Sequence, residues 1–281
     1  MKVEFWGVRG SIPVADPGAL RYGGNTSCVT VRLGDGSLVV LDAGTGIRAL
    51  GTVLKTTGPI HILLTHLHLD HIMGLLFFAP LFQPEREVTI WGPRSSVAGL
   101  RERLGRYLST PLSPVEIREL PAHVSFVACP HDVWRIGSAE VLCARVAHRG
   151  PTLGYRISEA GASLAYLPDH EPGLGQRLDS DPAEWISGLA LARDATLLIH
   201  DAQYTEREYQ TTIGWGHSRM ADALAFARRS GAGNIRLFHH DPAHDDALLD
   251  RLGAEAREAW SALGGEGEIA LAREGEELDV R

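Results

Sequence analysis

The 281-residue chain is 44% hydrophobic and 22% charged, which is the composition of a globular protein long enough to bury a substantial core. Its net charge of -8 argues against a protein whose main task is to bind the nucleic-acid backbone, because such binding needs a basic surface. No apolar run is long enough to span a membrane, and Glu4 and Arg9 interrupt the N-terminal segment where a signal peptide would be apolar. We therefore expect a protein of the reducing cytoplasm.

The first half of the chain is predicted to consist of short strands separated by loops and three helices. Apolar or β-branched runs bounded by turn residues indicate the strands, and helical spacing of apolar residues indicates the helices. The expected strands are Val3–Gly7, Ser27–Leu33, Ser37–Asp42, Ile60–His66 and Val88–Gly92, and the expected helices are Ile47–Leu54, Ile72–Phe82 and Ser95–Leu108.

The second half repeats this style. Asp181-Pro182 and Asp241-Pro242 each place an N-cap residue and a first-turn proline ahead of a helical stretch. Strands followed by helices in both halves predict an α+β fold of two sheets packed face to face, with helices outside, in a single domain spanning 1–281. The expected strands are Ala139–His148, Leu153–Ser158, Ala162–Asp169, Ala195–Asp201 and Asn234–His240, and the expected helices are Pro182–Arg193, Ser218–Arg229 and Pro242–Leu263.

Polar residues that can bind metals stand at the carboxyl ends of five expected strands. Strand ends that lead into loops are where a rigid scaffold presents reactive groups. A solvated surface cluster, the simplest alternative, would not require five separate strands to end in the same way. The strand-end residues are His66, His148, Asp169, His200 with Asp201, and His239 with His240.

The densest cluster is "HLHLDH", which runs from His66 to His71. If this segment is extended, His66, His68 and Asp70 project to one side, while the two leucines between them enter the core. A turn into a helix at Asp70 and His71 would bring both side chains back toward the same site.

The number of candidate ligands predicts two metal ions. A catalytic zinc ion takes three protein ligands and leaves one position for water, so seven ligands are too many for one ion. Two ions with three ligands each, sharing one bridging carboxylate, account for all seven. Imidazole and carboxylate donors without thiolate suit zinc, manganese or iron, with zinc favoured. The candidate ligands are His66, His68, Asp70, His71, His148, Asp169 as the bridge, and His239; His240 is expected to face the other side of its strand.

These residues carry a family resemblance over nearly the whole chain. "THLHLDH" resembles the HxHxDH signature of the metallo-β-lactamase superfamily, and the later His, Asp and His follow in that family's order. "VVLDAGTG" resembles the family's early strand that ends in a structural aspartate behind the ligands, here Asp42. The resemblance implies a four-layer αββα sandwich of two similar halves, with two metals at one edge.

Two kinds of feature indicate which branch of the superfamily the chain resembles: positions where it differs from other branches, and segments in its carboxyl-terminal part. Asp169 is not cysteine and His71 is present, unlike the commonest zinc β-lactamases, and His68 stands where oxygen-reducing diiron members carry glutamate. "LLIHDAQYTE" and "GWGHSRMADALAFARRSGAGNIRLFHHDP" resemble the carboxyl-terminal part of tRNase Z and related phosphodiesterases. The acidic residue and histidine that pair in those enzymes correspond to Asp201 and His217, with aspartate in place of the longer glutamate.

The resemblance implies a dinuclear metal-dependent phosphodiesterase. Metal-activated hydroxide would attack phosphorus, and His217, charged by Asp201, would protonate the leaving oxygen; Asp70 would be catalytic as a ligand. The alternative for His217 is a loop histidine before a helix that Ser218 caps. No long Gly/Pro/Lys-rich arm for gripping tRNA is visible, so a small phosphodiester such as a cyclic nucleotide or a short oligonucleotide end is expected rather than a long nucleic acid.

Two further features of the sequence concern possible substrate contacts and the cysteines. The glycine-rich segment at 7–26 offers Arg9, Ser11, Asn25 and Thr26 as phosphate contacts, although tight turns between strands explain it equally well. Cys28, Cys129 and Cys143 are odd in number and widely spaced, which predicts three buried thiols and no disulfide.

Rival functions are a lactonase or thioesterase with the same metals, or a non-catalytic metal-binding module. We also expect a homodimer, as in many relatives.

Overall fold

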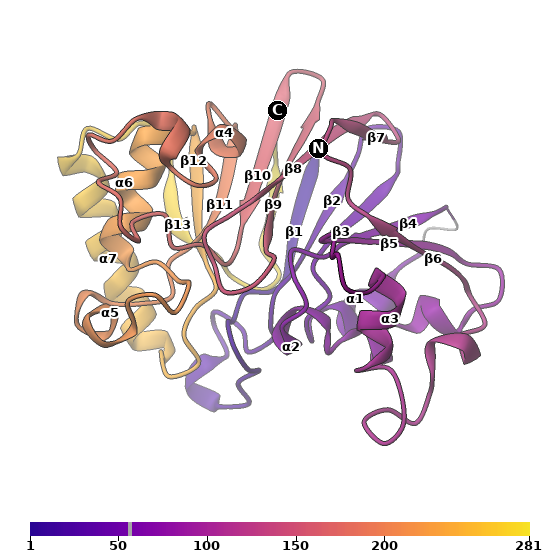
Figure 1. The fold of residues 1–281 in the computed structure, drawn as a ribbon. Helices are drawn as coiled ribbons and strands as arrows, with labels where there is room; N and C mark the ends of the chain where they lie inside the picture. The colour runs from indigo at the N-terminus through magenta and orange to yellow at the C-terminus, as the bar shows by residue number, and fades with distance from the viewer. Residues whose placement is uncertain (56–57) are drawn as a thin grey trace.

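Two seven-stranded mixed sheets form the centre of the computed structural model, which describes residues 1–55 and 58–281 (Figure 1). In spatial order, the first sheet consists of β14 (Glu277–Asp279), β1 (Lys2–Gly7), β2 (Cys28–Arg32), β3 (Leu38–Leu41), β4 (Ile60–Leu63), β5 (Glu87–Gly92) and β6 (His123–Ala128). The second consists of β13 (Ile269–Leu271), β12 (Asn234–Phe238), β11 (Leu197–Asp201), β10 (Ala162–Leu167), β9 (Leu153–Glu159), β8 (Ala139–Arg145) and β7 (Trp134–Ile136).

Each sheet contains a block of four parallel strands. β3 to β6 run parallel in the first sheet, and β10 to β13 run parallel in the second. The loops that follow neighbouring parallel strands leave from one edge of the sheet, so polar residues at those strand ends gather there. This topology positions the site described below.

Helices cover the outer faces of both sheets. Figure 1 shows α4, α6 and α7 against the second sheet, and α1 and α3 beside the first. The α-helices are α1 (Ile47–Val53), α2 (Leu69–Ile72), α3 (Leu100–Gly105), α4 (Leu189–Ala192), α5 (Glu206–Thr212), α6 (Met220–Ser230) and α7 (Asp246–Ala262). The 3-10 turns are η1 (Pro17–Ala19), η2 (Leu75–Phe77), η3 (Ala79–Phe82), η4 (Ile117–Glu119) and η5 (Ala183–Trp185).

Three apolar cores separate four layers. The central core lies between the sheets and includes Phe5, Tyr155, Tyr166 and Phe238. The other two lie between each sheet and its helices, one around Ile47 to Leu104 and one around Leu189 to Leu271. Burial of three apolar interfaces is the main stabilising contribution to such a sandwich. The αββα prediction is confirmed.

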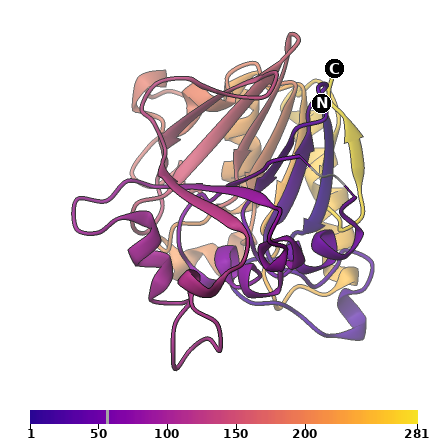
Figure 2. The same cartoon turned by 90° about the vertical axis from the view of Figure 1, so that its right-hand side faces the viewer.

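The chain ends meet at the same end of the molecule, as Figure 2 shows. β14 pairs with β1, and the Met1 amino group donates a hydrogen bond to the Val280 carbonyl at 3.0 Å. In the part of the chain that the structure describes, no helix has the length and apolar character needed to cross a membrane. Cys28 and Cys129 are buried free thiols as predicted, whereas Cys143 is only half-buried.

Three expected helices are shorter than predicted or are replaced by turns. In place of Ile72–Phe82 the chain forms two 3-10 turns, because Pro80 lacks an N–H donor and restricts the turn before it. In place of Pro182–Arg193 it forms η5 and α4, separated by Gly188 at φ 71°. The expected helix at Ser95–Leu108 is reduced to α3, which begins only after Gly99.

Three expected helix starts also differ from the structure. α7 begins at Asp246 and is capped by Asp245, whose side chain accepts from the Leu248 N–H, so Asp241-Pro242 precedes the helix. α6 has Arg219, not Ser218, at its N-cap position. The Asp181-Pro182 pair likewise stands before a single 3-10 turn. The strand β6 lies outside the predicted strands; it is at the edge of its sheet and none of its residues is fully buried.

Candidate metal centre

Strand ends bring the predicted ligands to one edge of the two sheets. His66 follows β4 of the first sheet, whereas Asp169 follows β10 and His239 follows β12 of the second. His148 lies three residues beyond β8, and the remaining ligands come from the start of α2. The two halves therefore contribute to one site, as the strand-end pattern indicated.

The segment from His66 to His71 departs from the extended form that we expected. α2 begins at Leu69 with His68 as its N-cap, so Asp70 and His71 turn inward together. Leu69 consequently points to solvent and is 56% exposed, which contradicts its expected place in the core. The early helix start is what makes Asp70 and His71 neighbours in one cluster.

The outer cluster consists of His66, His68 and His148. The imidazoles of His68 and His148 approach to 3.4 Å between Nδ1 and Nε2, and the ring of His66 lies 4.3 Å and 4.9 Å from theirs. His66 is buried, His148 is half-buried and His68 is exposed. This cluster therefore faces the solvent side of the centre.

The inner cluster consists of Asp70, His71 and His239, all buried. Oδ2 of Asp70 lies 3.3 Å from Nε2 of His71 and 3.3 Å from Nε2 of His239. The three donor atoms converge on one point, as metal ligands do.

Asp169 lies between the two clusters and turns one oxygen toward each. Its Oδ1 lies 3.0 Å from Nε2 of His71 and 3.4 Å from Nε2 of His239. Its Oδ2 lies 3.7 Å from Nε2 of His66 and 3.6 Å from Nε2 of His148. This is the geometry of a carboxylate that can bridge two ions.

The donor atoms fit a pair of divalent ions. Nε2 of His66, Nε2 of His71 and Oδ1 of Asp169 are buried without a hydrogen-bond partner, which is costly unless a further ligand satisfies them. Burial lowers the pKa of His66, His68 and His148, which favours the neutral imidazole that binds metals.

The carboxylates complete this electrostatic picture. Burial alone would raise the pKa of Asp169, but His239, His71 and His66 outweigh it and keep the carboxylate ionised. Burial likewise opposes the charged form of His71, but Asp169, Asp70 and Asp42 raise its pKa well above the usual value. The inner cluster thus concentrates negative charge, which a bound cation would neutralise.

Partners behind the ligands fix their orientation. Nδ1 of His71 donates to Oδ2 of Asp42 at 2.8 Å, and Asp42 also accepts from the hydroxyls of Thr65 and Tyr166. Nδ1 of His239 donates to Oε1 of Gln203 at 2.9 Å. Such contacts set the tautomer and ring plane of metal-binding histidines.

The outer cluster has uncharged partners behind its ring nitrogens. Nδ1 of His148 donates to the Gly216 carbonyl at 2.7 Å, and Nδ1 of His66 lies 3.0 Å from the Thr65 hydroxyl. Sequence reasoning anticipated Asp42 and missed Thr65, Gln203 and Gly216. Gln203 stands two residues beyond a strand that already ended in Asp201, so the strand-end rule could have included it.

Asp201 and His217 form a hydrogen-bonded pair beside this centre. Nδ1 of His217 donates to Oδ2 of Asp201 at 2.7 Å, so the shorter aspartate side chain reaches. Asp201 is fully buried and also accepts backbone N–H bonds from His170, Gln203 and Ser218.

The surroundings of His217 favour its charged form. Its ring stacks on His239 with centroids 4.8 Å apart, and its side chain is 12% exposed. Burial would lower its pKa, but Asp201 and Asp169 outweigh that effect and raise the pKa to about 9. A histidine that carries a proton near neutral pH therefore lies at the rim of the metal centre.

Most of the expected phosphate contacts do not reach the opening. Arg9 is fully buried, and its guanidinium donates to the carbonyls of Gly23, Asp241 and His244, so it holds loops together and contacts no substrate. Nδ2 of Asn25 donates to Glu274, and the buried Thr26 hydroxyl accepts from the Thr45 N–H. Each of the three side chains therefore has an internal partner, and the structure gives no support to them as phosphate contacts.

Ser11 alone remains beside the site. Its backbone N–H donates to Oδ2 of Asp70 at 2.8 Å, and it lines a cavity of about 430 Å³ together with His217, Tyr204 and Trp215. This cavity opens next to the general-acid candidate. The residues that line it come from the N-terminal segment, from the loops after β11 and β12, from α5 and from the loop between α5 and α6.

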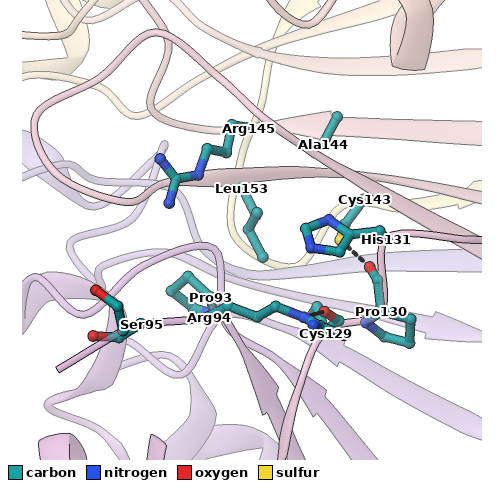
Figure 3. Close-up of a pocket in the computed structure, with 11 residues that line it drawn as sticks. Pro93, Arg94, Ser95, Cys129, Pro130, His131, Cys143, Ala144, Arg145 and Leu153 are labelled. Carbon is teal, nitrogen blue, oxygen red and sulfur yellow. Dashed lines mark hydrogen bonds between the residues drawn. The ribbon is translucent and has the colours of Figure 1, made fainter. Parts of the chain in front are cut away.

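A second cavity of about 380 Å³ flanks the centre on the side of β5, β6 and β8 (Figure 3). Figure 3 shows Arg94 and Arg145 on opposite walls, with Leu153 between them. Leu153 donates its N–H to the Thr65 carbonyl, directly before His66, and Arg145 lies three residues before His148. The cavity is therefore a neighbour of the outer cluster.

Comparison with known proteins agrees with this geometry. Residues 38–240 match the Beta-lactamase superfamily domain. The chain belongs to the metallo-β-lactamase superfamily. Ribonuclease Z from Haloarcula marismortui is 27% identical to it over 322 aligned positions, covering 100% of the chain and 97% of that enzyme.

Solved structures of the superfamily share the fold. The short form of human tRNase Z superposes with a TM-score of 0.68 at 22% identity, covering 100% of both chains. A diphosphatase of the PhnP family gives a TM-score of 0.70 at 21% identity, covering 100% of this chain and 98% of that one. The prediction of a metal-dependent hydrolase in the tRNase Z-like branch is confirmed. These relatives are named ribonuclease Z and tRNase Z, so they do not support the expectation of a small substrate in place of a long nucleic acid.

Proposed function

We propose that this superfamily member is a phosphodiesterase that uses two divalent ions, zinc by preference, with His217 as the general acid. The observation that carries the proposal is the Asp201–His217 pair at the rim of a seven-ligand centre. Divalent ions bound there supply activation of water and neutralise charge on a phosphoryl group. The set of ligands proposed is His66, His68, Asp70, His71, His148, Asp169 and His239, within one hydrolase domain formed by the whole chain.

The roles of the chain's own residues follow from the geometry. Nδ1–H of His217 is directed to Asp201, so Nε2–H is free to pass its proton to the leaving oxygen as the P–O bond breaks. Asp201 is held by three backbone N–H groups, which fix its orientation and so the plane of the imidazole. Stacking on His239 places the acid beside the metal ligands.

The cavity in Figure 3 supports a substrate with more than one phosphate. In a chain with net charge -8, this cavity is lined by Arg94 and Arg145 and by no Asp or Glu side chain among the described residues. Arg145 is exposed and makes no side-chain hydrogen bond or ion pair within the described part of the chain, whereas Nε of Arg94 donates to the Cys129 carbonyl. A free guanidinium is suited to a phosphate oxygen. We therefore favour an oligonucleotide end over a cyclic nucleotide.

The test compares leaving groups. An alkoxide needs a proton as it departs, whereas p-nitrophenolate does not, so His217→Ala should lose far more activity on a dinucleoside monophosphate than on bis(p-nitrophenyl) phosphate. We expect a loss of roughly 10²- to 10⁴-fold on the first and under about tenfold on the second. His123→Ala, at an exposed position, is the matched control. Equal losses on both substrates, with metal content unchanged, would remove His217 from the acid role.

Substrate size is tested with the same protein. Metal-loaded enzyme is compared on a short RNA, on a cyclic nucleotide and on a simple lactone. Arg145→Ala should raise KM for the RNA and leave the cyclic nucleotide unaffected. Turnover of the lactone alone would overturn the phosphodiesterase assignment and leave only the metal centre standing.

A further inference from the structure

The loop between α5 and α6 presents a large aromatic side chain beside the metal centre. Trp215 is 55% exposed and stands two residues before His217. It lies between Gly214 and Gly216, which have φ of 79° and 97°, so the backbone around it uses the left-handed region that glycine allows. An exposed tryptophan leaves apolar surface in water, and at the edge of a catalytic cavity it indicates a ligand contact.

The backbone on both sides of Trp215 is held in place by Glu171. This carboxylate is 1% exposed, and it accepts from the Gly214 N–H at 2.8 Å, from the Gly216 N–H at 2.7 Å and from the Tyr209 hydroxyl at 2.8 Å. Burying a carboxylate is costly unless donors surround it, and here two of the three donors flank Trp215. The Gly216 carbonyl is also held, because Nδ1 of His148 donates to it. The tryptophan therefore projects from a rigid loop.

The cavity that Trp215 lines is chemically suited to a neutral planar group. Tyr204 and Ser11 share its wall, while Glu208 and Asp241 add carboxylates. Both carboxylates already have internal partners, Thr205 and His244 for Glu208 and Gln203 for Asp241, so their main effect in the cavity is to repel a phosphate. His217 lines the same cavity, so a group bound there lies beside the proposed proton donor, where the leaving group would be.

We propose that Trp215 is a stacking platform for the nucleobase of the leaving nucleoside. This proposal rests on the proposed phosphodiesterase function and names the part of the substrate that the cavity binds. Base-on-aromatic stacking is tolerant of sequence, because every base has a π-face. The enzyme then recognises a nucleoside next to the scissile bond by stacking.

The kinetic test uses a dinucleoside monophosphate and two analogues, each lacking one base. Analysis of the reaction products identifies which of the two nucleosides is the leaving one. Trp215→Ala should lower kcat/KM about five- to a hundredfold on the intact dinucleotide and on the analogue that keeps the leaving base. It should leave the analogue without the leaving base unchanged. Trp215→Phe should retain most of the activity, and Trp185→Ala, at a tryptophan 66% exposed elsewhere on the surface, should behave as wild type.

Two kinetic outcomes would overturn the platform. An equal loss on all three substrates would mean that Trp215 only positions the His217 loop. No loss on any substrate would mean that the base does not contact it. In either case, wild-type turnover of the diester would leave the proposed function intact.

A binding measurement separates the two proposals without relying on catalysis. Saturation-transfer NMR with adenosine should detect contact in the wild type, in Trp215→Phe and in Trp185→Ala, and none in Trp215→Ala. Adenosine contact that depends on Trp215, in a protein that cleaves no diester, would sustain the platform and overturn the phosphodiesterase. Contact that persists in Trp215→Ala would overturn the platform.

Discussion

The outer and inner clusters have the same number of ligands but different surroundings. The outer cluster of His66, His68 and His148 includes an exposed ligand, and its ring nitrogens are oriented by a hydroxyl and a backbone carbonyl. The inner cluster of Asp70, His71 and His239 is buried, and its partners include the carboxylate of Asp42. A carboxylate behind a histidine makes that ligand more basic, so the inner position should bind its ion more tightly and the outer position should exchange with substrate and solvent.

The largest expected effect comes from removing the residue that the clusters share. Asp169→Asn keeps the shape of the side chain and removes its charge, so neither oxygen can bridge as a carboxylate does. We expect metal content to fall to about one ion per chain or less and diester turnover to fall roughly 10³-fold or more. Elemental analysis by mass spectrometry and a diester assay measure this. Two retained ions would show that the clusters are independent.

Single-ligand variants should then separate the clusters. His148→Ala removes an outer ligand, and we expect it to keep the inner ion through dialysis against a mild chelator. His71→Ala removes an inner ligand and should lose that ion under the same conditions. Both should lose most activity, so the informative quantity is the metal retained. Equal retention in the two variants would contradict the ranking of the sites.

A smaller effect is expected from the partner behind the inner cluster. Asp42→Asn keeps a hydrogen-bond acceptor and removes the charge, and asparagine tolerates the left-handed backbone found here at φ 58°. Metal affinity of the inner site should fall about 10- to 100-fold, measured by competition with a chromophoric chelator. Asp132→Asn, on an exposed loop, provides the matched control. An unchanged affinity would mean that the charge of Asp42 does not strengthen His71.

The smallest effect concerns the loop that supports the outer cluster. Glu171→Gln keeps the size of the side chain but places an amide NH2 opposite donors that now share one carboxylate. We expect unfolding free energy to fall by about 1–3 kcal/mol and KM to rise several-fold, with metal content unchanged. Denaturant unfolding and diester kinetics test this against Glu255→Gln, on the exposed face of α7. A loss of metal would instead place Glu171 among the supports of the ligands themselves.

The sequence predicted the layers of the fold and several of the candidate ligands that cluster at one edge, because both depend on where strands end. His66, Asp169 and His239 follow well-marked apolar strands, and such strands in two parallel blocks must end at one edge. Short helices were predicted less well, since Pro80 and Gly188 divide segments whose apolar spacing looked helical.

Residues whose role depends on distant partners could not be assigned from the sequence. From the sequence alone, Arg9 is interpreted as a phosphate contact. In the folded chain its guanidinium donates to the carbonyls of Asp241 and His244, which lie more than 230 positions away along the sequence. Glu171 and Trp215 give no local signal either, since only the folded chain brings the carboxylate under the Gly214–Gly216 loop. The sequence patterns indicate which residues lie at the ends of strands. They do not indicate which side chains those residues contact in the folded chain.

Three residues of the centre adopt backbone conformations that only glycine adopts readily. Ser11, Asp42 and His239 have φ of 61°, 58° and 63°, and each contacts a candidate ligand or is one. A non-glycine residue in this region costs of order 1–3 kcal/mol. The strain at these positions is offset by the hydrogen bonds that the strained residues make, since Asp42 accepts from the hydroxyls of Thr65 and Tyr166 and His239 donates to Gln203. Gly at position 42 would relieve the backbone strain but leave the buried donors of Thr65, His71 and Tyr166 without an acceptor, so relaxing the backbone here brings no net gain in heat resistance.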